Sequence, residues 1–176
     1  MIMSSTYRET VVDGYNLIHK LGKAGPGASM ADLRERLEAM LARYRQKARR
    51  HVILVYDGGS GPKPLTLTGA VDVTFSGTVK SADRWIIDHV RSLGVRATMT
   101  FVVSSDREIQ RYSKAYGAKC VDSETFIDEL AAMGIAIDKD GRRKGQQSGV
   151  KMNKNASGLL SDKEVDYWLG LFARKR

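Results

Sequence analysis

The chain has little of what exported, membrane-spanning or disulfide-stabilised proteins need. One cysteine, Cys120, stands among 176 residues, which excludes an intrachain disulfide and a multi-cysteine zinc site. The longest apolar run, residues 52–56, is far shorter than the roughly 20 residues that cross a bilayer. Residues 1–10 lack the charged start and apolar stretch of a secretory signal. We therefore expect a cytoplasmic protein with no membrane partner.

Aromatic residues are also few, at 7%, but the chain is not short of core-forming side chains. Apolar residues make up 42% and charged residues 28%, close to the globular averages of about 45 to 50% and 25%. These values exclude a wholly disordered chain and a collagen-like repeat. At this length one hydrophobic core is the expected arrangement.

The composition changes towards the end of the chain. Residues 141–157 contain five basic residues, no acid and no aromatic side chain, so they bury too little to offset their ordering entropy. An S-x-x-E box from Ser161 to Glu164 then predicts another helix. We expect a folded domain over residues 1–137, a basic flexible segment over 138–160 and a C-terminal helix over 161–176.

The net charge is +9, from 29 Lys and Arg against 20 Asp and Glu. Such a balance favours a polyanionic partner such as nucleic acid. A protein from a generally basic proteome is an equally good explanation of the charge alone.

Short β-branched runs alternate with helical patterns between residues 10 and 133, which predicts an α/β fold with a parallel sheet between helices. Strands are expected at residues 10–12, 51–56, 71–75, 97–104 and 118–121. Helices are expected at 29–50, 81–93, 105–117 and 123–133. Capping pairs open the first and third of these helices, Ser29 with Asp32 and Ser105 with Glu108.

Four aspartates stand where a strand ends or the next helix begins, namely Asp13, Asp57, Asp83 and Asp106. The carboxyl ends of parallel strands share one edge of a sheet, so these carboxylates should converge there. Unneutralised, they would repel one another, and a divalent cation with oxygen ligands removes that repulsion. Each one taken singly is an ordinary turn or helix-cap residue, and it is their number that favours a metal site.

Other chemistries find no support in the residues. The glycine-rich stretch at 22–27 lacks the Lys-Ser/Thr of a phosphate loop, and no G-x-G-x-x-G follows the first strand. There is no G-x-S-x-G, and Cys120 has no nearby histidine in sequence, which argues against acyl transfer. The spacing of the three histidines fits no metal motif.

The acidic positions lie in a recognisable series of motifs. It comprises V-V-D-G-Y-N at residues 11–16, V-Y-D-G at 55–58, K-S-A-D-R-W at 80–85 and S-S-D-R-E at 104–108. The series resembles the NYN domain of the YacP-like group, a branch of the PIN-like nucleases. The resemblance covers about residues 10 to 133.

The resemblance implies a PIN-like, Rossmann-like three-layer fold and metal-dependent hydrolysis of RNA. By position, Asp13, Asp83 and Asp106 match the acidic metal-site residues, with Mg²⁺ or Mn²⁺ as cofactor. Asp57 matches the D-G strand end, and Asn16 matches the polar residue after the first acid. These five are the predicted catalytic residues.

A metal ion at these acids would screen the phosphodiester and activate a water molecule for in-line attack. Predicted RNA contacts are Lys80, Arg84, Ser105 and Arg107, which flank the acids or stand at a helix N-terminus. The leading hypothesis is an endoribonuclease acting on mRNA or structured RNA, with ribosome association as one possibility. The alternatives are a non-catalytic RNA-binding module and a metal-dependent phosphatase. The sequence gives no indication of oligomeric state.

Overall fold

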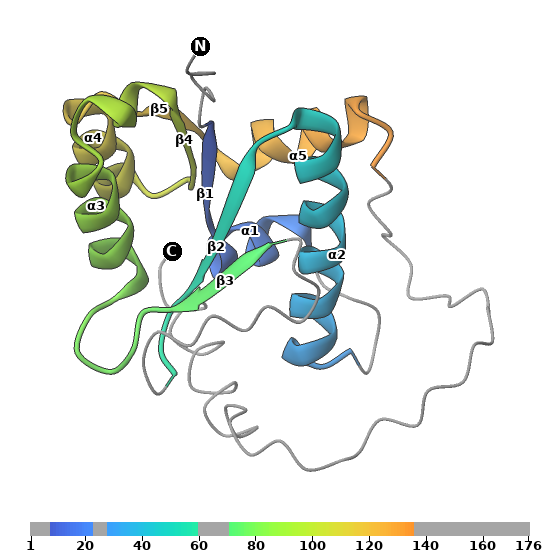
Figure 1. Cartoon of the computed structure of the whole chain (residues 1–176). Helices are drawn as coiled ribbons and strands as arrows, with labels where there is room; N and C mark the ends of the chain where they lie inside the picture. Colours follow the sequence, from blue (N-terminus) through green and yellow to red (C-terminus); the bar gives the residue numbers. More distant parts are fainter. Residues whose placement is uncertain (1–7, 23–27, 60–70, 136–176) are drawn as a thin grey trace.

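The computed structural model describes residues 8–22, 28–59 and 71–135 (Figure 1). The flexible segment expected at 138–160 and the helix expected at 161–176 lie outside the described residues, and so does the end of the predicted domain. The strands are β1 (Glu9–Asp13), β2 (His51–Tyr56), β3 (Asp72–Phe75), β4 (Thr100–Val103) and β5 (Lys119–Val121). The helices are α1 (Gly14–Leu21), α2 (Met30–Ala48), α3 (Ala82–Ser92), α4 (Arg107–Ala115) and α5 (Ser123–Ala132), with a 3₁₀ helix η1 (Gly94–Met99).

The five strands form one parallel sheet in the order β3-β2-β1-β4-β5. The central strand β1 pairs with both β2 and β4, and Val12 stands opposite Leu54 on one side and Val103 on the other. Such a strand is buried on both faces, which accounts for its run of fully buried residues. The predicted α/β fold with a parallel central sheet is confirmed.

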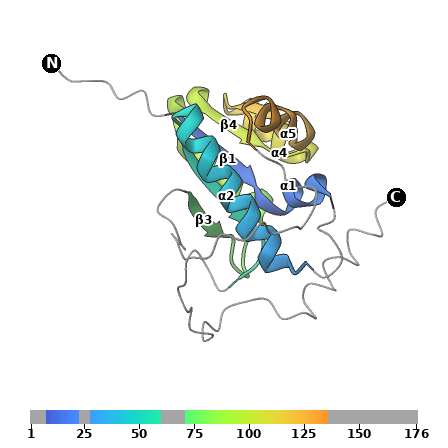
Figure 2. The same ribbon diagram turned by 90° about the vertical axis from the view of Figure 1, so that its right-hand side faces the viewer.

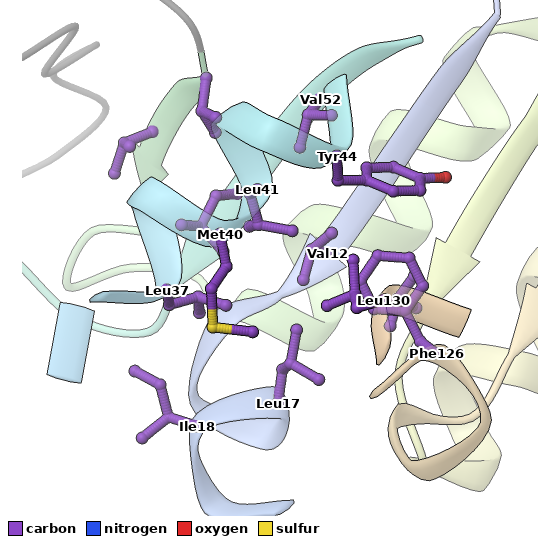
Figure 3. Close-up of a cluster of buried hydrophobic side chains, with 14 of the residues drawn as sticks. Val12, Leu17, Ile18, Leu37, Met40, Leu41, Tyr44, Val52, Phe126 and Leu130 are labelled. Carbon is purple, nitrogen blue, oxygen red and sulfur yellow. The ribbon is translucent and has the colours of Figure 1, made fainter. Parts of the chain in front are cut away.

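Helices cover both faces of the sheet, which gives three layers (Figures 1 and 2). On one face α1, α2 and α5 pack against Val12 of β1 in a large apolar cluster (Figure 3). On the other face α3 and α4 pack against Val11, the neighbouring residue. Alternate residues of a strand point to opposite faces, so β1 contributes to both halves of the core. No helix among residues 8–22, 28–59 and 71–135 is long and apolar enough to cross a membrane.

The structure differs from the expected elements in two places. Residues 14–21 form α1, where the sequence suggested only an Asp-Gly turn after the first strand. Gly14 is needed here for space, because a Cβ atom on it would lie 2.4 Å from Cε1 of Tyr56. The strand expected at 97–104 is shorter than predicted, because residues 94–99 form η1.

Helix starts follow the predicted caps except at α4. Ser29 and Asp32 form the complete capping box of α2. At α4 the cap is Asp106, whose carboxylate accepts the N–H groups of Glu108 and Ile109. The predicted Ser105 cap is wrong, because the hydroxyl of Ser105 donates to Glu124 on α5 instead.

Candidate active site

The strand order places a topological switch point between β1 and β4. The chain builds β1, β2 and β3 outward on one side of β1, then returns to add β4 and β5 on the other. At such a point the loops after the two adjacent strands diverge, and ligands of open α/β sheets bind there. Asp13 ends β1, and Asp106 follows β4 by three residues. The strand order thus puts two of the predicted acids at this switch point.

Asp13 is the most buried of the predicted site residues, with 7% of its surface exposed. It is the N-cap of α1, and its Oδ1 accepts the backbone N–H of Asn16 at 3.2 Å. Its Oδ2 accepts the hydroxyl of Ser104 at 3.0 Å. The pKa of Asp13 is raised to about 7, mainly by burial, with a smaller contribution from the charges of Asp83 and Asp106 and with these two hydrogen bonds acting in the opposite direction.

Asp83 and Asp106 reach the same region from two helix N-termini. Asp83 is the second residue of α3 and is open to solvent on one side. Partial desolvation raises the pKa of Asp83, and the negative charges of Asp106, Asp57 and Glu108 raise it further. The carboxylates predicted to share a metal ion therefore interact electrostatically with one another in the folded chain.

Asp57 joins the ends of two neighbouring strands to the start of α3. Its Oδ1 accepts the hydroxyl of Ser76 and the backbone N–H of Ala82, both at 3.0 Å. Ala82 is the first residue of α3, so this carboxylate fixes the helix turn that carries Asp83. The structure thereby gives Asp57 a positioning role within the group of acids.

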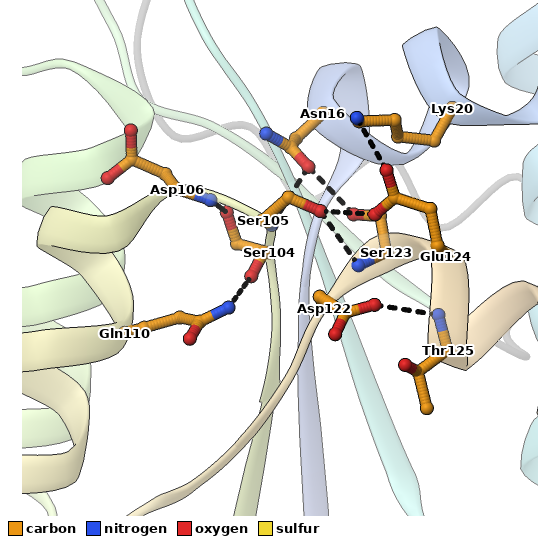
Figure 4. Close-up of polar contacts among 10 residues, drawn as sticks. All are labelled: Asn16, Lys20, Ser104, Ser105, Asp106, Gln110, Asp122, Ser123, Glu124 and Thr125. Atoms are coloured by element: carbon orange, nitrogen blue, oxygen red, sulfur yellow. Dashed lines mark hydrogen bonds and ion pairs between the residues drawn. The ribbon is translucent and has the colours of Figure 1, made fainter.

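A polar network connects the first turn of α1 to the loop before α4 and to the start of α5 (Figure 4). The side-chain oxygen of Asn16 accepts the N–H of Ser105 at 3.0 Å and the hydroxyl of Ser123 at 2.7 Å. Ser104 is fully buried, donates to Asp13 and accepts the N–H of Asp106 at 3.1 Å. The network therefore links Asp13 and Asp106 through one hydroxyl.

Ser105 is used entirely inside this network. Its N–H donates to Asn16, and its hydroxyl donates to Glu124 at 2.8 Å and accepts the N–H of Ser123 at 3.0 Å. Glu124 also pairs with Lys20 at 2.5 Å, and this bond, with that from Ser105, lowers the pKa of Glu124 to about 2. The predicted RNA contact of Ser105 would require some of these bonds to break.

The predicted cationic contacts fall into two groups. Lys80 and Arg84 both pair with Asp88 of α3, at 2.9 and 3.3 Å, and are more than half exposed. Exposed pairs of this kind contribute about 0 to 1 kcal/mol, so a phosphate can compete for them. Arg107 differs: among the described residues it forms no ion pair.

Arg107 begins a row of cations on the solvent side of α4. Ile109 and Ser113 are buried on the opposite side. Because an α-helix turns by about 100° for each residue, Arg107, Arg111 and Lys114 lie on one face of α4. We call this face the α4 basic stripe, and it consists of Arg107, Arg111 and Lys114.

Two basic residues near the end of α2 make contacts inside the fold. Arg50 donates to the carbonyls of Glu9 and Met99 and lies over the ring of Phe101 at 4.2 Å. Lys47 donates to the carbonyl of Met133 at the end of α5. Both hold parts of the fold together.

The donor set fits a hard divalent cation in its chemistry. Asp13, Asp83 and Asp106 offer carboxylate oxygens, the ligands that Mg²⁺ and Mn²⁺ prefer. Burial is the main cause of the raised pKa values of Asp13 and Asp83, and neighbouring carboxylates add to it. A cation would relieve this second, electrostatic part. In this conformation no three His, Cys, Asp or Glu side chains of the described ranges form a group that could hold a metal ion. Side-chain rotation is therefore needed to bring the three carboxylates onto one ion.

Several residues at the site escaped the sequence analysis. Glu108 was interpreted as a capping partner, but its charge acts on Asp83. Ser123 and Glu124 stand more than 100 residues after α1, so the bond of Ser123 to Asn16 and the ion pair of Glu124 with Lys20 leave no local pattern in the sequence. One sequence feature pointed to Ser104: it stands directly after β4 and two residues before Asp106.

Comparison with known proteins gives the family of the chain and supports its fold. The family model of the YacP-like NYN domain matches residues 10–171. The chain belongs to this family. The match extends beyond the resemblance over residues 10 to 133 and includes most of the segment from residue 138 onward. The family is one of PIN-like ribonucleases, which makes RNA the implied class of substrate for this YacP-like NYN domain.

Solved structures support the same relationship. A crystal structure of Rae1 (YacP) from Bacillus subtilis, in a tryptophan-to-leucine mutant form, shares 25% identity with a TM-score of 0.58. The match covers 72% of this chain and 77% of that chain. A second Rae1 (YacP) structure from Bacillus subtilis is similar in fold, with 23% identity, a TM-score of 0.53 and coverage of 71% and 74%. No curated protein matches the chain.

Proposed function

We propose that this YacP-like NYN domain is a metal-dependent endoribonuclease that hydrolyses RNA phosphodiester bonds. The observation that carries the proposal is the placement of Asp13 and Asp106 at the β1/β4 switch point, where the charges of Asp83 and Asp106 act on the buried Asp13. Acids held together in this way are unfavourable unless a cation neutralises them. We further propose that Mg²⁺ or Mn²⁺ is the cofactor.

The three aspartates would hold the ion, and a bound ion would supply charge neutralisation and an activated water molecule for attack on phosphorus. The chain's own residues prepare the site. Asp57 keeps α3, and with it Asp83, at the edge of the sheet. Ser104 spaces Asp13 from the loop of Asp106.

RNA is the proposed substrate because of the family and because cations surround the acidic edge. Lys80, Arg84 and Arg107 flank two of the acids in sequence. The α4 basic stripe leads from Asp106 along the helix, so a phosphate backbone that runs from the switch point along α4 would meet successive positive charges. Cleavage rates of an mRNA and of a structured RNA, compared directly, would show which of the two is the substrate.

The test uses the full chain with two substrates and two conditions. A structured RNA is incubated with Mg²⁺ and with chelator, and release of phosphate from nucleotides is measured in parallel. We expect internal cleavage of the RNA in Mg²⁺ only, with no phosphate release. RNA binding without cleavage would favour the non-catalytic binding module. Phosphate release from nucleotides would favour the phosphatase.

A further inference from the structure

The amide group of Asn16 has its orientation fixed by two hydrogen bonds. Its oxygen accepts the backbone N–H of Ser105 at 3.0 Å and the hydroxyl of Ser123 at 2.7 Å. A backbone N–H can only donate, so the atom facing it must be the amide oxygen. The amide nitrogen therefore points the other way, and Figure 4 shows it on the side of Asp106.

The two residues that hold this amide are themselves held firmly. Ser123 is fully buried, and its N–H donates to the hydroxyl of Ser105 at 3.0 Å. That hydroxyl donates to Glu124, which pairs with Lys20 on the same helix as Asn16. The loop of hydrogen bonds begins and ends on α1. A side chain restrained from both sides is preorganised for contact with a ligand.

The outward amide nitrogen suits a phosphate oxygen. It carries two N–H donors and no charge, and it stands at an edge whose other groups, Asp13 and Asp106, are acceptors that repel phosphate. The amide oxygen, with both of its acceptor positions in use, is not available to coordinate a metal ion. The chemistry left to Asn16 is donation.

We propose that Ser123 is a positioning residue of this site: with the N–H of Ser105 it fixes Asn16 so that the amide nitrogen donates to a nonbridging phosphate oxygen of RNA. This inference rests on the proposed function and adds to it a residue of α5, which lies outside the acidic motifs. Asn16 is the group that touches the substrate, and Ser123 acts through it.

Two substitutions separate donation from structure. Asn16→Asp keeps an acceptor for both Ser105 and Ser123 but replaces the outward N–H donors by oxygen. We expect the variant to stay folded in Mg²⁺ and kcat/KM for RNA cleavage to fall about 10-fold to 100-fold, the effect of losing a hydrogen bond to a charged group. The Mg²⁺ concentration for half-maximal cleavage should not rise, because the added charge does not weaken cation binding.

Ser123→Ala removes one of the two bonds that fix the amide, and we expect a loss of about 2-fold to 10-fold in kcat/KM. Ser123→Thr, which keeps the hydroxyl, should restore activity if the methyl group is accommodated. The matched control is Ser113→Ala, because Ser113 is also fully buried but its hydroxyl has no hydrogen-bond partner among the described residues. This control should cleave RNA as the wild type does.

Affinity for the same RNA is measured in Ca²⁺ for every variant, so that binding is read separately from cleavage. Weaker binding or slower cleavage by a stable Asn16→Asp variant supports the proposal. Wild-type affinity together with wild-type cleavage by Asn16→Asp overturns the proposal, because the amide nitrogen of Asn16 then makes no contact with the phosphate. If the wild type cleaves no RNA, the proposed function fails, and the affinities alone decide whether the amide contacts phosphate.

Discussion

Replacing Asp13 by Asn should stabilise the protein while abolishing its activity. In the folded chain Asp13 has a pKa of about 7, against an ordinary value of 3.8. At about 1.4 kcal/mol for each pKa step, this difference corresponds to about 4 kcal/mol of unfavourable free energy in the charged form. Asp13 is almost fully buried, so solvent does little to reduce that figure. An amide has the same shape and carries no charge.

The hydrogen bonds of Asp13 survive the change. The new amide oxygen accepts the N–H of Asn16, and the new amide nitrogen donates to the hydroxyl oxygen of Ser104, in place of the two bonds that the carboxylate accepts. We therefore expect most of the electrostatic gain to appear as stability, about 2 to 4 kcal/mol at pH 8.

The sign of the pH dependence follows from the raised pKa. Between pH 4 and pH 7 the folded wild type binds a proton at Asp13 that the unfolded chain has released, so wild-type stability falls as the pH rises through this window. In the folded wild type the carboxyl group of Asp13 is neutral up to about pH 7 and charged above it. The advantage of Asp13→Asn should thus be absent near pH 4, grow through the window and level off above pH 7.

The assay is urea unfolding in chelator at several pH values. Asp88→Asn is the control, because Lys80 lowers the pKa of the partly exposed Asp88, and removal of this charge should cost rather than add stability at neutral pH. Mg²⁺ should stabilise the wild type and leave Asp13→Asn unchanged, which narrows the gap. Equal stabilities of the wild type and Asp13→Asn at pH 8 in chelator would refute the argument from burial. Wild-type cleavage by the folded variant would remove Asp13 from the metal site.

Three further predictions concern the rest of the site and its support. The double variant Asp83→Asn/Asp106→Asn should cleave RNA little worse than either single variant, because residues that share one ion act as a unit, and fully additive losses would separate their roles. Gly14→Ala should lower the free energy of unfolding by about 1 to 3 kcal/mol in a urea titration, because its Cβ meets the ring of Tyr56; an unchanged midpoint would contradict this. Neutralising the α4 basic stripe should flatten the salt dependence of RNA binding by up to about 0.7 log units for each lost contact with single-stranded RNA, and more than neutralising the two cations that pair with Asp88. An unchanged salt slope would take the stripe out of the RNA path.

The parts of the fold that local sequence signals determine were predictable. The Ser29 capping box and the start of α3 after Ser81 each involve residues within one helical turn, and both are confirmed. The helix α1 was missed because Asp-Gly is a common turn, and its eight residues gave too short a pattern to outweigh that signal. What selects Gly14 is the ring of Tyr56 on the neighbouring strand, a tertiary contact with no local pattern.

The candidate site divides in the same way. Parallel strands end at one edge, which predicts that the four aspartates lie near one another, and the charges of Asp57 and Asp106 do act on Asp83. The bonds of Asn16 to Ser105 and Ser123 join segments 89 and 107 residues apart. Such contacts depend on how α5 packs beside α1, which no periodicity in the sequence reports.

Helix capping and metal binding need not compete for these aspartates. In sequence each Asp could be explained as a cap, and that explanation weighed against a metal site. The structure shows that Asp106 caps α4 with Oδ1 alone, and that Asp57 holds α3 with Oδ1 alone. Among the described residues, no hydrogen bond is made by the second oxygen of either carboxylate. A carboxylate with one oxygen bound to a helix N-terminus keeps its second oxygen for another ligand. The cap interpretation of these aspartates therefore does not argue against a metal site.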